Sequence, residues 1–379
     1  MNPHPMTSSR SGRATLSDRI YVREGNESDN QALLELTRAT PMAGAISIRI
    51  DREPDFFALL RLRGETKIFV AVRGSQLIGC ISAALRTAYV MGAPETVAYV
   101  GDMKINPQFS GGPTALRLIQ SLEAYLRSMG IDLCFSVVAE GNCRALPLFE
   151  GRLGTPRWAP LGRFLVDEML SSPFKGRAGK YSIGIAEVAE IASITALLNH
   201  FHRGRQFASR ISENDVASML FRRTEHASTK VFVARTGEKT VGVMSLYDAA
   251  QVKQNVLLNT PATIRAALAL LRIGSTPFSN LKIPRIGNSV QLLYVRTLAC
   301  EEQHSEALAC LLRAARAEAF QQRFALLALG LHERDPLRKL LRMVPRFTFS
   351  SLAFATSLTA PKRLEALSSG IPFEDFALV

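Results

Sequence analysis

One stretch, residues 99–149, constrains the fold of this chain more than any other. Residues 100–105 are typical of a short strand, and Pro107 ends it because proline has no N–H to donate to a sheet ladder. The sequence Ser-Gly-Gly-Pro at residues 110–113 allows a tight turn, and proline suits a first helical turn, where an N–H would lack a helical partner anyway. Apolar residues then recur at helical spacing over residues 114–129. This order predicts a strand, a turn and a long helix.

The helix leads directly into a second strand. Gly130 is a natural C-terminal stop for the helix, and residues 131–138 are largely apolar, as expected of a strand that is buried on both faces. The whole stretch therefore predicts a βαβ unit. A glycine-containing turn that opens a helix presents free backbone N–H groups at the positive end of the helix dipole, which suits a phosphate group. Residues 110–113 thus predict an anion site, although pairs of glycines also occur in turns that bind nothing.

Further positions in and after the βαβ unit form a characteristic set. They are Pro107, Phe109, Gly111, Ala115, Leu122, Glu123, Gly130, Ile131, Asp132, Asn142, Ala145, Leu148, Phe149 and Glu150. Together they resemble, without a gap, the core of the GNAT acyltransferases (GCN5-related N-acetyltransferases). Residues 21–36 look like that family's first strand and helix, and residues 69–81 look like its second and third strands. The resemblance covers residues 20–170 well and the remainder as a worn second copy.

The second half of the chain repeats the pattern of the first. Residues 232–237 (FVARTG) echo residues 69–74 (FVAVRG), and a helix expected over residues 304–320 is followed by the apolar residues 324–331. We therefore expect an α/β (α+β) protein with two acyl-CoA N-acyltransferase (GNAT) folds in tandem. Each would be a mixed, mostly antiparallel central sheet flanked by helices.

The expected boundaries follow from local composition. Residues 1–18 are rich in Ser and Arg and have no apolar core, so we expect a disordered tail and no secretory signal. Residues 19–170 would form the first GNAT domain, which binds acyl-CoA, and residues 171–180 combine small, basic and helix-breaking residues as a linker does. Residues 181–379 would form the second domain, in which residues 346–356 are expected to close the second sheet.

The two copies differ where the phosphate turn would lie. In place of residues 110–113, the second copy has Cys-Glu-Glu-Gln-His-Ser-Glu at residues 300–306, with no glycine and three carboxylates. Acidic side chains suit the positive end of a helix but compete with a phosphate for the same N–H groups. We infer that the second copy is degenerate and holds no nucleotide there. Its insertion, residues 259–288, carries a short apolar helix that is either a lid over the acceptor site or a packed surface helix.

The resemblance implies transfer of an acyl group from acetyl-CoA or another acyl-CoA to an amine, by direct attack within a ternary complex. It implies that backbone N–H groups of Met103, Lys104 or Ile105 contact the thioester oxygen and the pantetheine, and that the pyrophosphate lies over the start of the next helix. The cofactor contacts that it implies are Met103, Lys104, Ile105, Ser110, Gly111, Gly112, Pro113, Thr114, Ala115 and Asn142. We expect no metal.

The reaction also needs a group that takes a proton from the amine. A lysine-like amine has a pKa of about 10.4, so a nearby base helps at neutral pH. Asp102 on the central strand and Glu140 at the end of the next strand are the candidate catalytic residues. Each has a plain structural alternative: Asp102 can cap the backbone or pair with an arginine, and Glu140 can simply be exposed where its strand ends.

Three positions depart from the family's pattern. Ser110 stands where an arginine or glutamine usually opens the phosphate turn, and Pro113 replaces the middle glycine and has no N–H. Phe149 replaces a tyrosine that in many members protonates the leaving thiolate. Water, Tyr99 or Tyr125 would then take that last role. Because of these three departures together, a protein that binds its ligand without catalysing transfer stays a second possibility.

Charge and composition narrow the choice of partners. Lys and Arg number 46 against 33 Asp and Glu, a formal net charge of +13, and a basic surface attracts anionic partners such as a nucleotide or an acidic acyl-carrier protein. No aromatic stripe or zinc-type spacing points to nucleic acid, which we do not expect as a partner. No run of 18 apolar residues occurs, so no membrane span is expected. The five cysteines form no CxxC pair and indicate reduced thiols in a cytoplasmic protein.

We therefore expect an N-acyltransferase whose acceptor is an amine of a small molecule or a protein. Three alternatives stay open. They are an N-acyl synthase that uses a longer acyl chain on CoA or on a carrier protein, a pseudoenzyme that binds CoA or a metabolite and regulates another process, and an interaction module that binds neither. The fold is compatible with many kinds of acceptor, and a homo-oligomer is also left open.

Overall fold

The computed structural model of the protein describes residues 19–42, 44, 46–110, 112–142, 144–151, 155–174, 179–221, 229–274 and 281–379. Its strands are β1 (Ile20–Glu24), β2 (Ser47–Asp51), β3 (Glu65–Arg73), β4 (Gln76–Val90), β5 (Ala93–Ile105), β6 (Leu133–Ala139), β7 (Ala159–Leu170), β8 (Ser182–Ile185), β9 (Arg205–Gln206), β10 (Thr229–Thr236), β11 (Lys239–Asp248), β12 (Gln254–Asn259), β13 (Ser289–Val290), β14 (Leu292–Cys300), β15 (Leu326–His332), β16 (Arg346–Ser357) and β17 (Ile371–Pro372). Its α-helices are α1 (Asn30–Ala39), α2 (Phe56–Arg63), α3 (Thr114–Ser128), α4 (Leu146–Phe149), α5 (Ile191–Arg203), α6 (Glu213–Phe221), α7 (Ala262–Gly274), α8 (Ser305–Gln321) and α9 (Arg363–Ser368).

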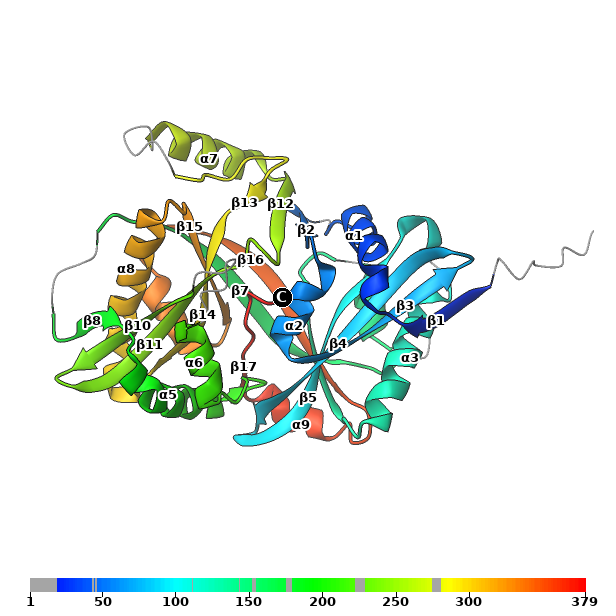
Figure 1. The fold of residues 1–379 in the computed structure, drawn as a ribbon, viewed down its shortest axis with the longest axis horizontal. Helices are drawn as coiled ribbons and strands as arrows, with labels where there is room; N and C mark the ends of the chain where they lie inside the picture. Colours follow the sequence, from blue (N-terminus) through cyan, green and yellow to red (C-terminus); the bar gives the residue numbers. More distant parts are fainter. Residues whose placement is uncertain are drawn as a thin grey trace, which may run out of the picture.

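A 12-stranded sheet runs through the molecule in the order β1-β3-β4-β5-β6-β16-β7-β15-β14-β11-β10-β8 (Figure 1). Strands β1 to β6 of the first half and strands β8 to β15 of the second half follow the same internal order, with antiparallel neighbours except for one parallel pair in each half. These pairs are β5 with β6 and β14 with β15. The expected mixed, mostly antiparallel sheet flanked by helices is confirmed.

The two halves exchange their last strands. Strand β16 pairs with β6 of the first half, and β7 pairs with β15 of the second half, while β7 and β16 also pair with each other. The expectation that residues 346–356 close a separate second sheet is therefore wrong. Each half lends one strand to the other, so a single continuous sheet replaces two independent ones.

Successive residues of the strands face two different cores. In β3, Ala71 faces the cluster beneath α3, which includes Leu118, whereas Val70 and Val72 face the cluster beneath α1 and α2. This alternation follows from the two-residue period of a strand. Strand β3 is therefore buried on both faces.

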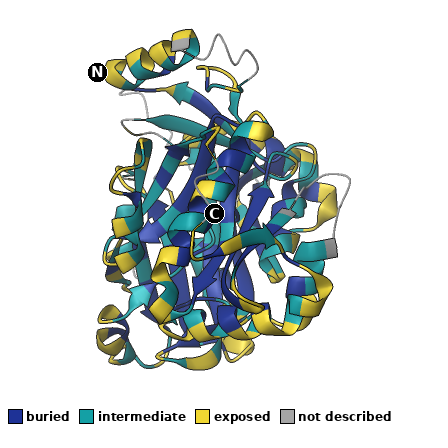
Figure 2. Cartoon of the chain, turned by 90° about the vertical axis from the view of Figure 1, so that its left-hand side faces the viewer, coloured by how far each residue is buried: buried dark blue, intermediate teal, exposed yellow. Residues whose placement is uncertain are grey.

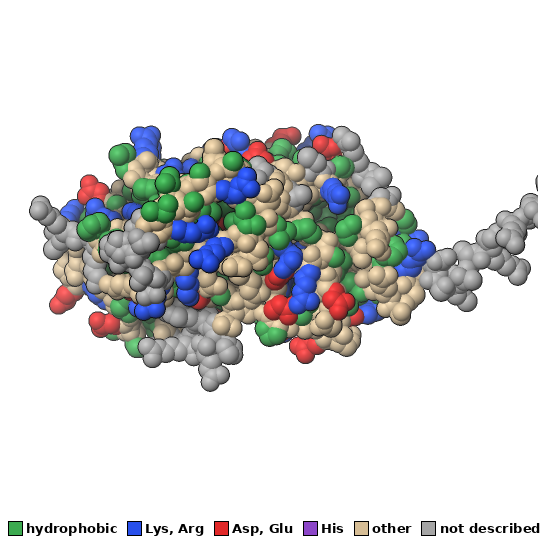
Figure 3. Space-filling model, turned by 90° about the horizontal axis from the view of Figure 1, so that it is seen from above, with side chains coloured by type: hydrophobic (Ala, Val, Ile, Leu, Met, Phe, Trp, Pro, Cys, Tyr) green, Lys and Arg blue, Asp and Glu red, His purple; other side chains and the backbone are tan. Residues whose placement is uncertain are grey.

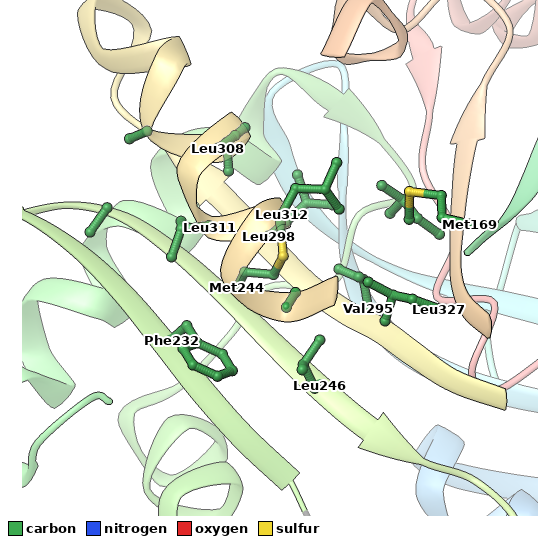
Figure 4. Close-up of a cluster of buried hydrophobic side chains, with 14 of the residues drawn as sticks. Met169, Phe232, Met244, Leu246, Val295, Leu298, Leu308, Leu311, Leu312 and Leu327 are labelled. Carbon is green, nitrogen blue, oxygen red and sulfur yellow. The ribbon is translucent and has the colours of Figure 1, made fainter. Parts of the chain in front are cut away.

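The second half is built in the same way around α8. Helix α8 buries Leu308, Leu311 and Leu312 in a cluster with Met244 and Leu298, which extends over β11, β14 and β15 (Figure 4). Leu311 is fully buried there. The central strands and the inward face of α8 thus form a continuous apolar core of close-packed side chains.

Helix α7 lies in the insertion of the second half, residues 259–288, where the sequence predicts a short apolar helix. It follows β12, which pairs with β13 and with β2 of the first half in a small separate sheet. Figure 2 shows α7 at the top of the molecule, with much of its surface exposed. In the part of the chain that the structure describes, none of the helices has the length and apolar character to traverse a bilayer.

Candidate functional site

Strands β5 and β6 pair over only two positions and then separate. The pairs are Ala98 with Cys134 and Tyr99 with Phe135. Beyond them, β5 continues to residue 105 and β6 to residue 139 without pairing to each other. We call these unpaired segments, residues 100–105 and 136–139, the strand opening. Its backbone groups on the facing edges are available to a ligand, because no ladder uses them.

A β-bulge shapes the β5 side of this opening. Cys80 of β4 pairs with Lys104, whereas Ser82 pairs with Gly101, so β5 carries one extra residue between these pairs. Asp102 lies in this bulge with a φ of 53°. A bulge re-aims side chains and locally disrupts a ladder. The N–H of Asn106 donates to the Ile78 carbonyl of β4 at 2.8 Å. Because successive N–H groups of a strand alternate in direction, the N–H of Ile105 points towards the opening.

The turn after β5 leads to the start of α3. Asn106 Oδ1 accepts a hydrogen bond from the Gln108 N–H at 3.0 Å, and Ser110 Oγ donates one to the Pro107 carbonyl at 2.7 Å. Gly112 is exposed, and a Cβ added to it would approach no atom more closely than the Phe109 carbonyl oxygen at 4.0 Å. The turn therefore has open space beside its backbone.

The first turn of α3 has features that suit an anion. Pro113 occupies the N-cap position, no side chain caps the helix, and no acidic residue lies in its first turn. The Thr114 hydroxyl is buried and has no hydrogen-bond partner among the described residues. An uncapped helix start leaves its first N–H groups unpaired, and these groups attract phosphate. The residues present thus fit the diphosphate of CoA.

The equivalent turn of the second half is occupied by its own side chains. Lys239 Nζ contacts Glu301 Oε1 at 2.6 Å, and the hydroxyl of Tyr181 lies 3.2 Å from Nδ1 of His304. Glu306 adds a carboxylate to the first turn of α8. Strands β14 and β15 also separate after Tyr294, so the second half has a similar opening. The turn beside that opening, however, carries acidic side chains.

Asp102 is the centre of a buried polar network. Its carboxylate accepts hydrogen bonds from Arg52, from Ser82 Oγ at 2.8 Å and from Arg63 Nη1 at 3.4 Å. Burial alone would raise the pKa of Asp102, but the charges of Arg52, Arg63 and Lys104 outweigh it and hold the pKa well below its usual range. Burial lowers the pKa of the Lys104 ammonium, while the charge of Asp102 opposes this shift.

The segment after β17 lies against this network, at the centre of the molecule (Figure 1). Arg63 Nε donates to the Leu378 carbonyl at 2.5 Å, and Lys253 Nζ donates to the carbonyls of Phe376 and Val379 at 2.9 and 2.8 Å. Burial, together with the charge of Arg63, lowers the pKa of Lys253 to about 7.

Two ion pairs fix the same segment to opposite halves. Glu374 accepts hydrogen bonds from both terminal nitrogens of Arg86 of β4, at 3.0 and 2.6 Å, and Asp375 accepts one from Arg296 of β14 at 2.8 Å. The two-pronged pair of Arg86 with Glu374 also fixes the orientation of the two side chains. The end of the described chain therefore connects the two halves.

The other predicted site residues lie at the edge of the strand opening. The Glu140 side chain is 45% exposed and its Oε1 lies 3.8 Å from Nη1 of Arg163, so its surroundings differ from those of Asp102. Asn142 lies in the turn after β6, and its carbonyl accepts a hydrogen bond from the Ala145 N–H at 3.0 Å. Met103 lies in β5, Ala115 lies in the first turn of α3, and Gly111 lies outside the described residues.

Phe149, which stands where many family members have a tyrosine, is packed against other aromatic rings. Phe149 stacks on Phe354 with ring centroids 4.6 Å apart and meets Trp158 edge-on at 5.2 Å. Tyr99 is buried beneath the guanidinium of Arg63, and burial raises its pKa above the ordinary value. A buried phenol with a raised pKa holds its proton firmly, so it is a weak proton donor to a thiolate.

The sequence did not single out Arg63, Ser82 or Lys253. These residues come from α2, β4 and the turn before β12, and nothing in their spacing indicates that they meet. Among the residues that the structure describes, no group of three or more His, Cys, Asp or Glu side chains is arranged to hold a metal ion.

Comparison with known proteins gives a family match and a set of shared folds. Residues 31–155 match the family described as "Acetyltransferase (GNAT) family". No curated protein sequence matches the chain. N-myristoyltransferase of Saccharomyces cerevisiae, solved with bound myristoyl-CoA, is 11% identical with a TM-score of 0.61, and the match covers 95% of this chain and 86% of that one.

Two bacterial structures are similar over nearly the same length. A GCN5-related N-acetyltransferase from Anabaena variabilis is 11% identical with a TM-score of 0.53, and the match covers 88% of this chain and 72% of that one. A probable N-acyltransferase from Enterococcus faecalis is 10% identical with a TM-score of 0.52 and the same two coverages. At these identities the solved structures establish the fold alone, while the family match confirms the resemblance stated from the sequence over residues 31–155.

Proposed function

We propose that this protein, whose residues 31–155 match the GNAT acetyltransferase family and whose chain has a similar fold, transfers an acyl group from acyl-CoA to an amine. The observation that carries the proposal is the uncapped, acid-free start of α3 beside the strand opening. The same features together are absent from the described part of the second half, where Glu301 and Glu306 lie at the start of α8. We therefore assign the donor site to the first half.

In this proposal the acyl donor lies across the strand opening. The diphosphate of CoA contacts the N–H groups of Gly112 and of the first turn of α3, where Thr114 offers its hydroxyl. The pantetheine runs along β5 towards Asn142, and the N–H of Met103 or Ile105 donates to the thioester oxygen as negative charge builds on it. A bond forms between the amine nitrogen and the carbonyl carbon, the carbon–sulfur bond breaks, and CoA leaves as the thiolate, which takes a proton.

The two candidate bases have different environments. The pKa of Asp102 is held low by Arg52 and Arg63, and a carboxylate with a low pKa is a poor acceptor for an ammonium proton. We therefore propose that Asp102 positions these two guanidinium groups beside the opening. The proton of the amine passes to water or to Glu140, which is partly exposed at the end of β6.

The acceptor is an amine of a small molecule or a protein. The second candidate function, transfer of a longer acyl chain, is favoured by the likeness to a fold whose yeast representative was solved with myristoyl-CoA. A CoA-binding regulator without turnover is the outcome if the donor binds and no acceptor reacts.

The test is release of free CoA thiol by the purified chain. Acetyl-, octanoyl- and myristoyl-CoA are each incubated with pools of amino acids, polyamines, aminoglycosides and lysine peptides. The proposal expects amine-dependent release above hydrolysis with at least one donor and one pool. Binding of CoA without release from any pool would instead identify a regulator, and absence of both would refute the proposal.

The role of Glu140 is tested by the pH dependence of that rate. Glu140→Gln should lower the rate most at low pH and least near pH 10, where the amine is already free of its proton. Glu333→Gln is the matched control, because Glu333 Oε2 contacts the same Arg163 at 3.0 Å. Equal losses in the two variants at every pH would exclude Glu140 as the base.

A further inference from the structure

A pocket of about 590 Å³ lies beneath α7, apart from the strand openings. Its walls come from α7, from the end of β7, from the start of β16 and from residues 281–283. Ala325 also lines the pocket and lies just before β15. The opening between β14 and β15 begins only after Ala328, so the pocket and this opening are separate. Apart from Ser171 and Arg346, every side chain that lines it is apolar. Arg346 is held by Asp167, with Nε 2.9 Å from Oδ1. The pocket is therefore an apolar space outside the proposed acyl-transfer site.

Large apolar side chains are exposed around this pocket. Among the described residues, ten large apolar side chains are exposed, and five of these lie within three residues of the pocket lining or belong to it. The five are Phe174, Leu270, Ile273, Ile286 and Met343. Met343 is 94% exposed and Leu270 is 68% exposed. Clusters of exposed apolar side chains at one place mark an interaction site.

Two segments that line the pocket carry positive charge and no negative charge. No Asp or Glu occurs in residues 249–300 or in residues 336–364, and both segments line the pocket. Within six residues of the lining residues, five basic side chains of these segments are exposed and form no salt bridge within the described part of the chain: Arg265, Lys282, Arg285, Lys339 and Arg342. Seen from above, the face that carries α7 shows Lys and Arg side chains among apolar ones (Figure 3).

We propose that this face is a docking surface for an anionic lipid bilayer. Leu270 and Met343 enter the interface between headgroups and acyl chains, the basic residues lie against the headgroups, and the pocket accepts part of a lipid acyl chain. Apolar side chains that project from a helix with basic but no acidic residues, and from its neighbouring loops, suit an anionic membrane surface. An acidic protein would satisfy the charges, but an open apolar pocket with exposed apolar side chains near its lining residues suits the acyl chain of a lipid.

The test is flotation of the full chain with vesicles. We expect binding to vesicles of phosphatidylcholine with phosphatidylglycerol and little binding to phosphatidylcholine alone. Arg265→Gln and Lys282→Gln should each weaken binding about fivefold, from the contribution of one basic residue near an anionic surface. Leu270→Glu with Met343→Glu should abolish it.

Matched controls keep the result interpretable. Met91→Glu with Met129→Glu changes two other exposed methionines, far from the lining residues in the sequence, and should leave binding unchanged. Unchanged melting temperatures show that each variant is folded. The proposal is overturned if the wild type ignores anionic vesicles, or if both double variants bind equally. It is also overturned if Leu270→Glu instead dissociates an oligomer or releases an acidic carrier protein while vesicles remain unbound.

Discussion

Arg52 and Asp102 form an ion pair that is almost entirely buried, although fifty residues separate them in the sequence. Their side chains are 4% and 5% exposed. Two further nitrogens of Arg52, Nε and Nη1, are buried without a hydrogen-bond partner among the described residues. The carboxylate of Asp102 therefore balances the charge of a buried guanidinium whose hydrogen-bond donors are only partly paired. The same carboxylate also contacts Arg63.

Removing the Asp102 charge should destabilise the protein strongly. Asp102→Asn leaves two buried guanidinium groups without a carboxylate, and breaking a buried pair in this way costs about 3–5 kcal/mol. Glu53→Gln is the control, because Glu53 pairs with Arg38 where both are well exposed, and such a pair contributes about 0–1 kcal/mol. Urea unfolding of the full chain measures both. Similar small losses in the two variants would mean that the buried network contributes nothing specific.

The same pair predicts a pH dependence with a defined sign. The pKa of Asp102 in the folded protein lies below its unfolded value, so its stabilisation is present above about pH 4. It is lost as the pH falls through the folded pKa. The difference in unfolding free energy between the wild type and Asp102→Asn should therefore shrink below pH 4. A constant difference down to pH 2 would contradict this assignment.

Glu168 should have the opposite effect at higher pH. Burial raises its pKa to about 8, so the folded protein keeps a proton that the unfolded chain releases at about pH 4.5. Stability should fall as the pH rises from about 5 to 8, by up to about 1.4 kcal/mol per pH unit from this group. Glu168→Gln should remove that slope, and Glu365→Gln, at an exposed position, should not. Matched slopes for the two variants would refute the shift.

Leu311 tests the packing of the second half. It is fully buried between α8 and the sheet, and Leu311→Ala should cost about 2–5 kcal/mol because it leaves a cavity. Leu270→Ala, on the exposed face of α7, should change stability by no more than about 0.5 kcal/mol. Thermal and urea unfolding compare the two variants. A loss below 1 kcal/mol for Leu311→Ala would show that this core can collapse around the gap.

The sequence predicted local elements well where the pattern is periodic and punctuated. The helix expected over residues 114–129 is α3, and the strand expected over residues 131–138 is β6, displaced by one or two residues. Glycine and proline mark these boundaries, and the apolar spacing defines the face that is buried. The insertion helix was predicted for the same reasons.

The exchange of β7 and β16 was beyond such reasoning. Both strands mix apolar and polar residues, and neither sequence distinguishes the edge of one half from the edge of the other, so the choice depends on contacts between residues more than a hundred positions apart. The network around Asp102 was missed in the same way. A single arginine in α2 or a lysine before β12 carries no local signal, and only the fold brings it to the strand opening.

The central claim is that one CoA binds per chain, at the start of α3. Isothermal titration with CoA compares the wild type with Gly112→Asp and with Gln303→Asp, which adds the same charge at an exposed position beside α8. Gly112 has room for the new side chain, so a loss would reflect repulsion of the diphosphate. We predict one site in the wild type, weakened at least about tenfold by Gly112→Asp and unchanged by Gln303→Asp. No heat of binding in the wild type, or a loss confined to Gln303→Asp, would contradict the account.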